Sequence, residues 1–116
     1  MNPGHTVTIT PSSLHVEVQV DGTTIAKSDR PLLLDETGLP TRYYLPKDDV
    51  RMDLLEPTTF ATTCPFKGEA SYWSLELDGT RHDGIVWGYE APIETAKDIA
   101  GYVCFYPERV DLIITD

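Results

Sequence analysis

The chain has 116 residues, which is room for one domain because compact domains usually span ~100–200 residues. Hydrophobic residues make up 41% of it and charged residues 24%, and no apolar run approaches the ~20 residues of a membrane-spanning helix, so the composition excludes a transmembrane protein. Nine basic and nineteen acidic residues give a formal charge of −10, which would repel a polyanion. We therefore expect a single domain over residues 1–116, with neither nucleic acid nor membrane as a partner.

The first residues and the cysteines bear on the compartment and on metal binding. Residues 1–6 contain no Lys or Arg and lead into no apolar block, so they do not look like a secretory signal and we expect a cytoplasmic protein. Cys64 and Cys104 belong to no Cys-x-x-Cys pair and have no His nearby at ligand spacing. We expect no metal site and no cofactor, and the oligomeric state stays open.

Alternation of polar and apolar residues predicts strands in the first half of the chain. Residues 14–20 alternate strictly, and the Asp21-Gly22 pair that follows is a strong signal for a two-residue hairpin turn. Further strands are predicted over residues 24–28, 32–34 and 41–45. After Pro46, apolar spacing and an acidic first turn predict a helix over residues 47–55.

The second half continues with turns at short intervals. Residues 58–68 have no clean period, which favours an ordered loop with a strand fragment. A strong strand over 69–77 leads through the Asp78-Gly79 hairpin signal into a return strand over 85–89. A short helix over 93–100 and strands over 101–106 and 110–115 complete the prediction. The predicted fold class is therefore mainly β, with two short helices.

Five segments carry a resemblance to a known family: residues 42–46 (RYYLP), 49–55 (DVRMDLL), 63–74 (TCPFKGEASYWS), 86–89 (VWGY) and 99–103 (IAGYV). Over about residues 14–113 the chain resembles the family catalogued as domain of unknown function 427 (DUF427), which is also labelled nucleotidyltransferase-like. The resemblance implies a β-tent-like fold, in which two antiparallel sheets lean against each other and short helices occupy the connections. This fold agrees with the strands predicted from the residue pattern.

Large aromatic residues near the second hairpin predict a ligand pocket. Trp87 and Tyr89 lie two apart on a predicted strand, so their rings project from one face. An uninterrupted hairpin would place Tyr72 beside Trp87 and Trp73 on the opposite face. A one-residue bulge at Gly84 would instead bring Trp73 to Trp87. The competing interpretation for each ring is ordinary core packing.

We hypothesise a pocket for a small planar, partly anionic molecule, because flat rings supply apolar contact area while cations orient an anionic group. Its candidate ligand-binding residues are Tyr44, Arg51, Tyr72, Trp87 and Tyr89, with Cys64 and Lys67 at its edge. The charged and thiol groups have ordinary alternatives. Arg51 and Lys67 could pair with nearby carboxylates, and Cys64 could pack as a small apolar side chain.

Three other functions stay open. Cys64 and Lys67 could be the catalytic pair of a cysteine-dependent enzyme, since a nearby ammonium favours the nucleophilic thiolate. The family label implies nucleotidyltransferase-like activity, although the chain contains no Asp-x-Asp pair and no Gly-x-x-x-x-Gly-Lys phosphate loop. A protein-interaction module would show an exposed apolar patch. The sequence therefore leaves open whether the protein is an enzyme.

Overall fold

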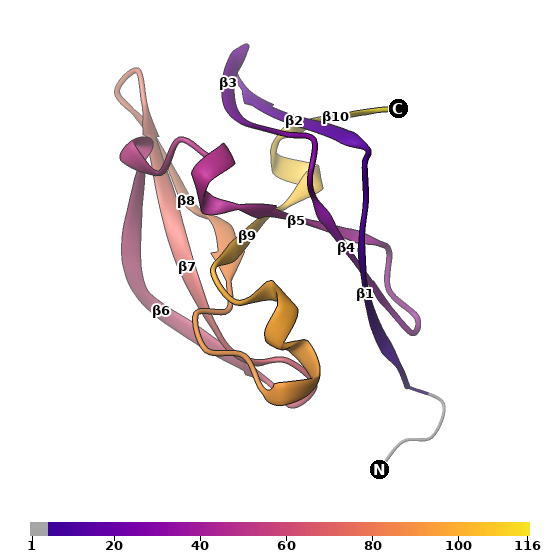
Figure 1. Cartoon of the computed structure of the whole chain (residues 1–116). Coiled ribbons are helices and arrows are strands. Elements are labelled where there is room, and N and C mark those ends of the chain that lie inside the picture. Colours follow the sequence, from indigo (N-terminus) through magenta and orange to yellow (C-terminus); the bar gives the residue numbers. More distant parts are fainter. Residues whose placement is uncertain (1–4) are drawn as a thin grey trace.

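The computed structural model describes residues 5–116, which form ten strands and four short 3-10 helices (Figure 1). Residues 1–4, on which most of the prediction about a secretory signal rests, lie outside the described residues. The strands make up two sheets in which all neighbours are antiparallel. The predicted mainly β fold with a pair of antiparallel sheets is confirmed.

The larger sheet has seven strands in the order β1-β4-β5-β9-β8-β7-β6. Their bounds are β1 (Val7–Pro11), β4 (Leu32–Glu36), β5 (Arg42–Pro46), β6 (Leu55–Cys64), β7 (Gly68–Leu77), β8 (Thr80–Gly88) and β9 (Tyr102–Phe105). The smaller sheet has the order β10-β2-β3, with β2 (His15–Val20), β3 (Thr23–Ser28) and β10 (Asp111–Thr115). The two sheets meet where β1 runs into β2 and β3 runs into β4 (Figure 1). Among the helices of residues 5–116, none is both long and apolar enough to cross a membrane.

Two clusters of buried side chains lie on the two faces of the larger sheet, because neighbouring residues of one strand point to opposite sides. Leu45 and Val86 belong to one cluster, and their neighbours Tyr44 and Trp87 belong to the other. The first cluster fills the space toward the smaller sheet and contains Val16, Val18, Ile25, Trp73, Leu75, Val103 and Phe105. The second cluster includes Leu34, Tyr89, Cys104, Ala96 and Ile99, the last two from the 3-10 helix η3 (Glu94–Ile99).

The predicted hairpins are confirmed. Asp21 and Gly22 both have positive φ angles, of 50° and 81°, and Asp78 and Gly79 have φ angles of 50° and 79°. Two consecutive positive φ angles give the turn the twist of the strands that it joins, which is why Asp-Gly is favoured there. The strands predicted on either side of both turns are present, with ends shifted by a few residues.

The helix predicted over residues 47–55 is wrong. Two 3-10 helices, η1 (Lys47–Asp49) and η2 (Met52–Leu54), occupy this stretch instead. Between them Val50 is extended, with φ −121° and ψ 141°, and forms an antiparallel bridge with Ala26 of β3. Val50 is buried in the first cluster, so a β-branched residue that packs against the smaller sheet interrupts the helical pattern.

The loop predicted over residues 58–68 is also wrong in its first part, where β6 runs to Cys64. The pairing of β6 with β7 is irregular between Pro57 and Ala61. Most residues of β6 are exposed, so the strand lacks the alternation of buried and exposed positions by which a pattern search finds strands. The strand β1 was not predicted, and the helix predicted over 93–100 is the 3-10 helix η3, which is kinked at Ala96. The last 3-10 helix, η4 (Pro107–Arg109), joins β9 to β10.

Candidate functional site

The pairing of β7 with β8 decides which aromatic residues share a face. Leu75 pairs with His82, but Trp73 pairs with Val86, so β8 holds two more residues than β7 in this interval. An insertion of two residues preserves the alternation of faces, whereas an insertion of one would reverse it. Trp87 therefore pairs directly with Tyr72, and Trp73 stays on the opposite face. The irregularity suspected at Gly84 exists, but it does not bring the two tryptophans together.

Tyr72, Trp87 and three other candidate site residues line one cavity of about 200 Å³, on the face of the second cluster. We call it the aromatic cavity. Its walls are Leu34, Glu36, Leu39, Pro40, Arg42, Tyr44, Lys67, Tyr72, Trp87, Tyr89 and Tyr106. Five of the seven candidate residues thus meet in one place, although they come from β5, β7, β8 and the segments that flank these strands.

The rings of the cavity are held by their own contacts. The indole Nε1 of Trp87 donates a hydrogen bond of 3.0 Å to the hydroxyl of Tyr44, whose ring stands edge-on to it at a centroid distance of 6.3 Å. The ring of Tyr106 lies 4.5 Å from that of Trp87. Burial raises the pKa of Tyr44 and that of Tyr89 far above the ordinary value for tyrosine. Both hydroxyls are therefore neutral at physiological pH.

A buried ion pair forms one end of the cavity. The ammonium of Lys67 lies 2.7 Å from Oε1 of Glu36, and Nε2 of His5 lies 2.9 Å from the other carboxylate oxygen. Burial alone would raise the pKa of Glu36, but the hydrogen bond and charge of Lys67, together with the contact to His5, lower it below the ordinary value. Glu36 is therefore ionised and compensates the charge of Lys67.

Arg42 is the cation of the cavity that has no such compensation. Its guanidinium carbon lies 5.3 Å from the centre of the Trp87 ring, and the residue is half-buried. Among residues 5–116 no carboxylate lies within ion-pair distance of it. Because the charge of Glu36 compensates that of Lys67, the charged side chains that line the cavity have a net charge of one positive unit, which belongs to Arg42.

The structure does not bring Arg51 to this cavity. Its guanidinium is exposed and pairs with Asp53 at 2.8 Å, and the residue lines a separate hollow beside β3. The reason is the bridge between Val50 and Ala26, which draws the chain around Arg51 toward the smaller sheet. The expected contribution of Arg51 to the pocket rested on the helix that is absent.

Cys64 lies beside the cavity without lining it. The side chain is half-buried and packs against the second cluster. The backbone N–H of Lys67 donates to the carbonyl of Cys64 at 3.2 Å, but the ammonium of Lys67 is engaged by Glu36. Catalysis by a Cys64–Lys67 pair gains no support from these contacts and stays a hypothesis. Burial raises the pKa of the other thiol, that of Cys104, to about 12.

The sequence analysis missed four residues of the site: His5, Glu36, Arg42 and Tyr106. Alternation could have found two of them. Arg42 is two residues before Tyr44 on β5, and Glu36 is two residues after Leu34 on β4, so each shares a face with a predicted or buried residue. No pattern in the sequence places His5 at this site, because its contact with Glu36 depends on the pairing of β1 with β4.

Residues 5–116 contain no group of three or more His, Cys, Asp or Glu side chains that could hold a metal ion. The comparison with known families gives one match of nearly full length. A family model described as "Domain of unknown function (DUF427)" matches residues 8–116. A search of the curated proteins finds no match to the chain.

Proposed function

The chain belongs to the DUF427 family, and from this premise we propose that its aromatic cavity binds a small planar molecule with one anionic group. The observation that carries the proposal is the guanidinium of Arg42. It lies over the ring of Trp87 inside the cavity and has no acidic partner among the described residues. A half-buried cation that the protein itself leaves unpaired is a place for an anion from outside.

The electrostatics of the whole chain favour this location. A protein with a formal charge of −10 repels anions over most of its surface. The aromatic cavity departs from this background, since Arg42 adds a positive charge to a pair that is already neutral. Attraction over a low-dielectric wall of rings is stronger than in water. An anion that reaches the cavity is therefore held by Arg42.

The rings favour a flat molecule. Trp87, Tyr106 and Tyr72 present aromatic surface to the cavity, and aromatic surfaces contact planar groups over a large apolar area. The neutral hydroxyl groups of Tyr44 and Tyr89 can donate hydrogen bonds to a polar edge of the ligand. At about 200 Å³ the cavity suits a single-ring acid.

Benzoate is a suitable probe, with benzamide as its uncharged counterpart. The two tryptophans give two indole N–H signals in NMR spectra, one from each face of the larger sheet. We expect benzoate to shift the signal of Trp87 and to leave that of Trp73 in place. Benzamide should bind at least about tenfold more weakly than benzoate. A tenfold loss corresponds to ~1.4 kcal/mol for the lost charge interaction.

The variant Arg42→Met keeps much of the aliphatic stem and removes the charge, so it should lose the benzoate response. Arg51→Gln is the matched control, because Arg51 is an arginine on the surface outside the cavity. It should bind benzoate as the unaltered protein does, and both variants should keep the melting temperature. Equal binding by the Arg42→Met variant, or no response of Trp87 at saturating benzoate, would show that the proposal is wrong.

A further inference from the structure

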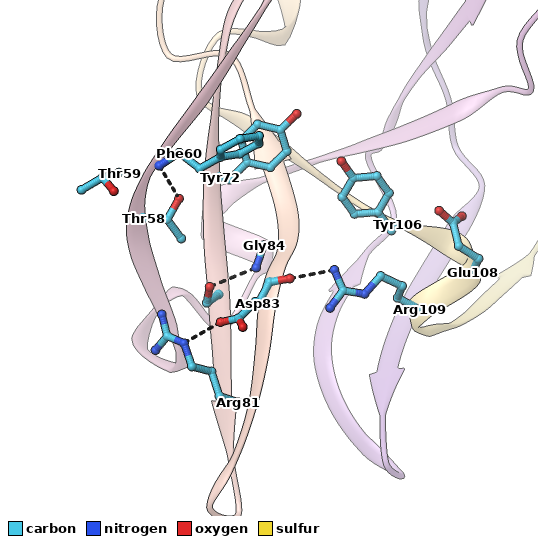
Figure 2. Close-up of a pocket in the computed structure, with 11 residues that line it drawn as sticks. Thr58, Thr59, Phe60, Tyr72, Arg81, Asp83, Gly84, Tyr106, Glu108 and Arg109 are labelled. Carbon is cyan, nitrogen blue, oxygen red and sulfur yellow. Dashed lines mark hydrogen bonds and ion pairs between the residues drawn. The ribbon is translucent and has the colours of Figure 1, made fainter.

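The structure has a second and larger cavity, of about 560 Å³ (Figure 2). Figure 2 shows Phe60 and Tyr72 on one side of it and Tyr106 and Arg109 on the other. We call it the outer cavity. Tyr72 and Tyr106 line both cavities, so the two are adjacent and the tyrosine pair stands at their boundary.

Both irregularities of the β6–β7–β8 meander face the outer cavity. The bulge of β6 lies between Pro57 and Ala61 and exposes Phe60, whose side chain is 62% accessible. The bulge of β8 contains Gly84, which has a φ of +57° and lines the cavity; an added Cβ there would meet no atom within 4 Å. Bulges are frequent beside binding sites, because they aim side chains away from the regular sheet.

Aromatic side chains line both cavities, and Tyr72 and Tyr106 belong to each. The ring of Phe60 packs against that of Tyr72 at a centroid distance of 5.0 Å. The hydroxyl of Tyr72 lies 2.9 Å from Oγ1 of Thr62, which holds the ring in place. On the opposite side Tyr106 contacts Trp87 of the aromatic cavity. A flat molecule can therefore find stacking partners along both cavities.

The charges of the outer cavity are balanced, unlike those of the aromatic cavity. Arg81 pairs with Asp83 at 2.7 Å and with Glu76 at 3.0 Å. Arg109 donates a hydrogen bond of 2.7 Å to the carbonyl oxygen of Asp83, and its neighbour Glu108 lines the same cavity. Within the described part of the chain Arg109 has no carboxylate within ion-pair distance, but the two arginines and two carboxylates that line the outer cavity give it no net charge, which suits the uncharged part of a ligand.

We infer that the site takes an elongated aromatic monocarboxylic acid with two flat groups, one in each cavity. This inference rests on the proposed function. The carboxylate lies on Arg42 with the first ring against Trp87, and the second ring packs on Phe60. To reach Phe60 it separates the side chains of Tyr72 and Tyr106, which interact with each other in the free chain. A monoanion is favoured over a dianion because the side chains that line the aromatic cavity have a net charge of only one positive unit.

The test compares two acids that differ only in the second ring, para-benzyloxybenzoate and para-methoxybenzoate, by calorimetry on the whole chain. Burial of the extra ring should make the benzyloxy acid bind about tenfold more tightly. The variant Phe60→Ala should abolish this advantage and leave the affinity for the methoxy acid unchanged. Phe60 is exposed, so its truncation does not open the core.

Ile113→Ala is the matched control, since Ile113 is an exposed apolar residue on β10 that lines neither cavity. It should leave both affinities unchanged. Equal affinities for the two acids, or an advantage of the benzyloxy acid that survives Phe60→Ala, would overturn the inference while the proposed function stands. If neither acid binds, the proposed function fails and the inference fails with it.

Discussion

The two tryptophans of the β7–β8 hairpin lie on opposite faces of one sheet and have different surroundings. Each is nearly buried, at 7% exposure for Trp73 and 8% for Trp87, and each has a cation over its ring. The ammonium of Lys47 lies 5.0 Å from the Trp73 ring and is paired with Glu90 at 2.6 Å. Arg42, over Trp87, has no acidic partner among the described residues. Within residues 5–116 the first cation is paired and the second is not, and the proposed ligand site rests on this difference.

The surroundings of the two rings also differ in polarity, and those of Trp87 are the more polar. Trp73 packs among aliphatic residues between the two sheets, in the first cluster. Trp87 donates a hydrogen bond to Tyr44 and borders a cavity with further hydroxyl groups and a buried ion pair. Aliphatic packing stabilises a fold, whereas a buried ion pair is weak evidence for stability and an unpaired cation offers an anion a binding position. We therefore assign stability to the Trp73 face, and the proposed ligand site lies on the Trp87 face.

Deletions in β8 give the largest expected effect. Removing Gly84 alone would leave one extra residue in β8. The residues after the deletion would then point to the opposite face of the sheet, which would put Trp87 into the first cluster. We expect this deletion to abolish cooperative unfolding, because the loss would consume most of a typical stability of ~5–15 kcal/mol. Removing Asp83 and Gly84 together restores an even pairing and should leave a folded protein.

Circular dichroism during urea denaturation measures the stability of both deletion variants. The shorter deletion should be the more damaging one, which is the reverse of what the number of removed residues alone would suggest. A single deletion that unfolds at a higher urea concentration than the double deletion would contradict the assignment of the two faces by pairing.

The register of this hairpin also shows what the sequence could and could not predict. The turn residues Asp78 and Gly79 and the alternation around them predicted the strands but left open whether Trp73 and Trp87 share a face, which the pairing of β7 with β8 decides. The size of the bulge could not be predicted, because it depends on the contact of the Gly84 N–H with the Ser74 hydroxyl, 3.0 Å away. A contact between two strands cannot be predicted from the residue pattern of either strand alone.

The candidate site follows the same division. Tyr44, Tyr72 and Trp87 were predicted from β-formers that alternate on strands, and their cavity is formed by strand pairing that preserves this alternation. Arg51 was assigned from a helix that does not form, because Val50 bridges to β3 instead. Local propensity thus positioned the aromatic residues, and tertiary contacts decided which arginine meets them.

Substitution of either tryptophan by leucine tests the comparison directly. Trp73→Leu should lower the free energy of unfolding by about 2–3 kcal/mol, because it leaves a void in the aliphatic cluster. The folded fraction should still bind benzoate normally. Trp87→Leu should lower stability by a similar amount, since it also leaves the buried hydroxyl of Tyr44 without its donor, but it should abolish benzoate binding.

Chemical denaturation and calorimetry with benzoate separate the two results. The comparison fails if both variants lose benzoate binding to the same degree after correction for the folded fraction. It also fails if Trp87→Leu binds benzoate as well as the unaltered protein does.

The buried pair of Glu36 with Lys67 gives the next effect. Glu36→Gln leaves the ammonium of Lys67 without its counterion in a place where the side chain is only 12% exposed. We expect a loss of about 2 kcal/mol in the free energy of unfolding. Asp53→Asn is the matched control, because the Arg51–Asp53 pair is exposed on both sides and its removal should have no measurable effect.

The same pair predicts the sensitivity to acid. The pKa of Glu36 is lower in the folded chain than its ordinary value of 4.5. The stabilisation is therefore fully present above pH 4.5 and is lost as the pH falls through the lowered folded pKa. Urea denaturation over this acid range should show a smaller pH dependence for the Glu36→Gln variant than for the unaltered protein. Equal slopes would contradict the assignment.

Thiol labelling gives the smallest expected effect. The labelling rate of Cys104 reports how often the structure on the Trp87 face opens locally. Cys104 is paired with Trp87 in the ladder of β8 and β9 and is buried, which raises the pKa of its thiol to about 12. Cys64 is half-buried at the end of β6. An aromatic disulfide reagent should label Cys64 in the native chain and reach Cys104 only through opening or after denaturation.

The rate at Cys104 then distinguishes the two faces without a ligand. Trp87→Leu removes the ring paired with Cys104 and should raise the labelling rate of Cys104 more than Trp73→Leu does, although the two variants lose a similar free energy of unfolding. Local opening exposes only the face that moves, whereas global unfolding exposes both thiols together. If both variants raise the Cys104 rate in proportion to their loss of stability, the Trp87 face opens only with the whole sheet. Its cavity would then be as rigid as the aliphatic core on the other side.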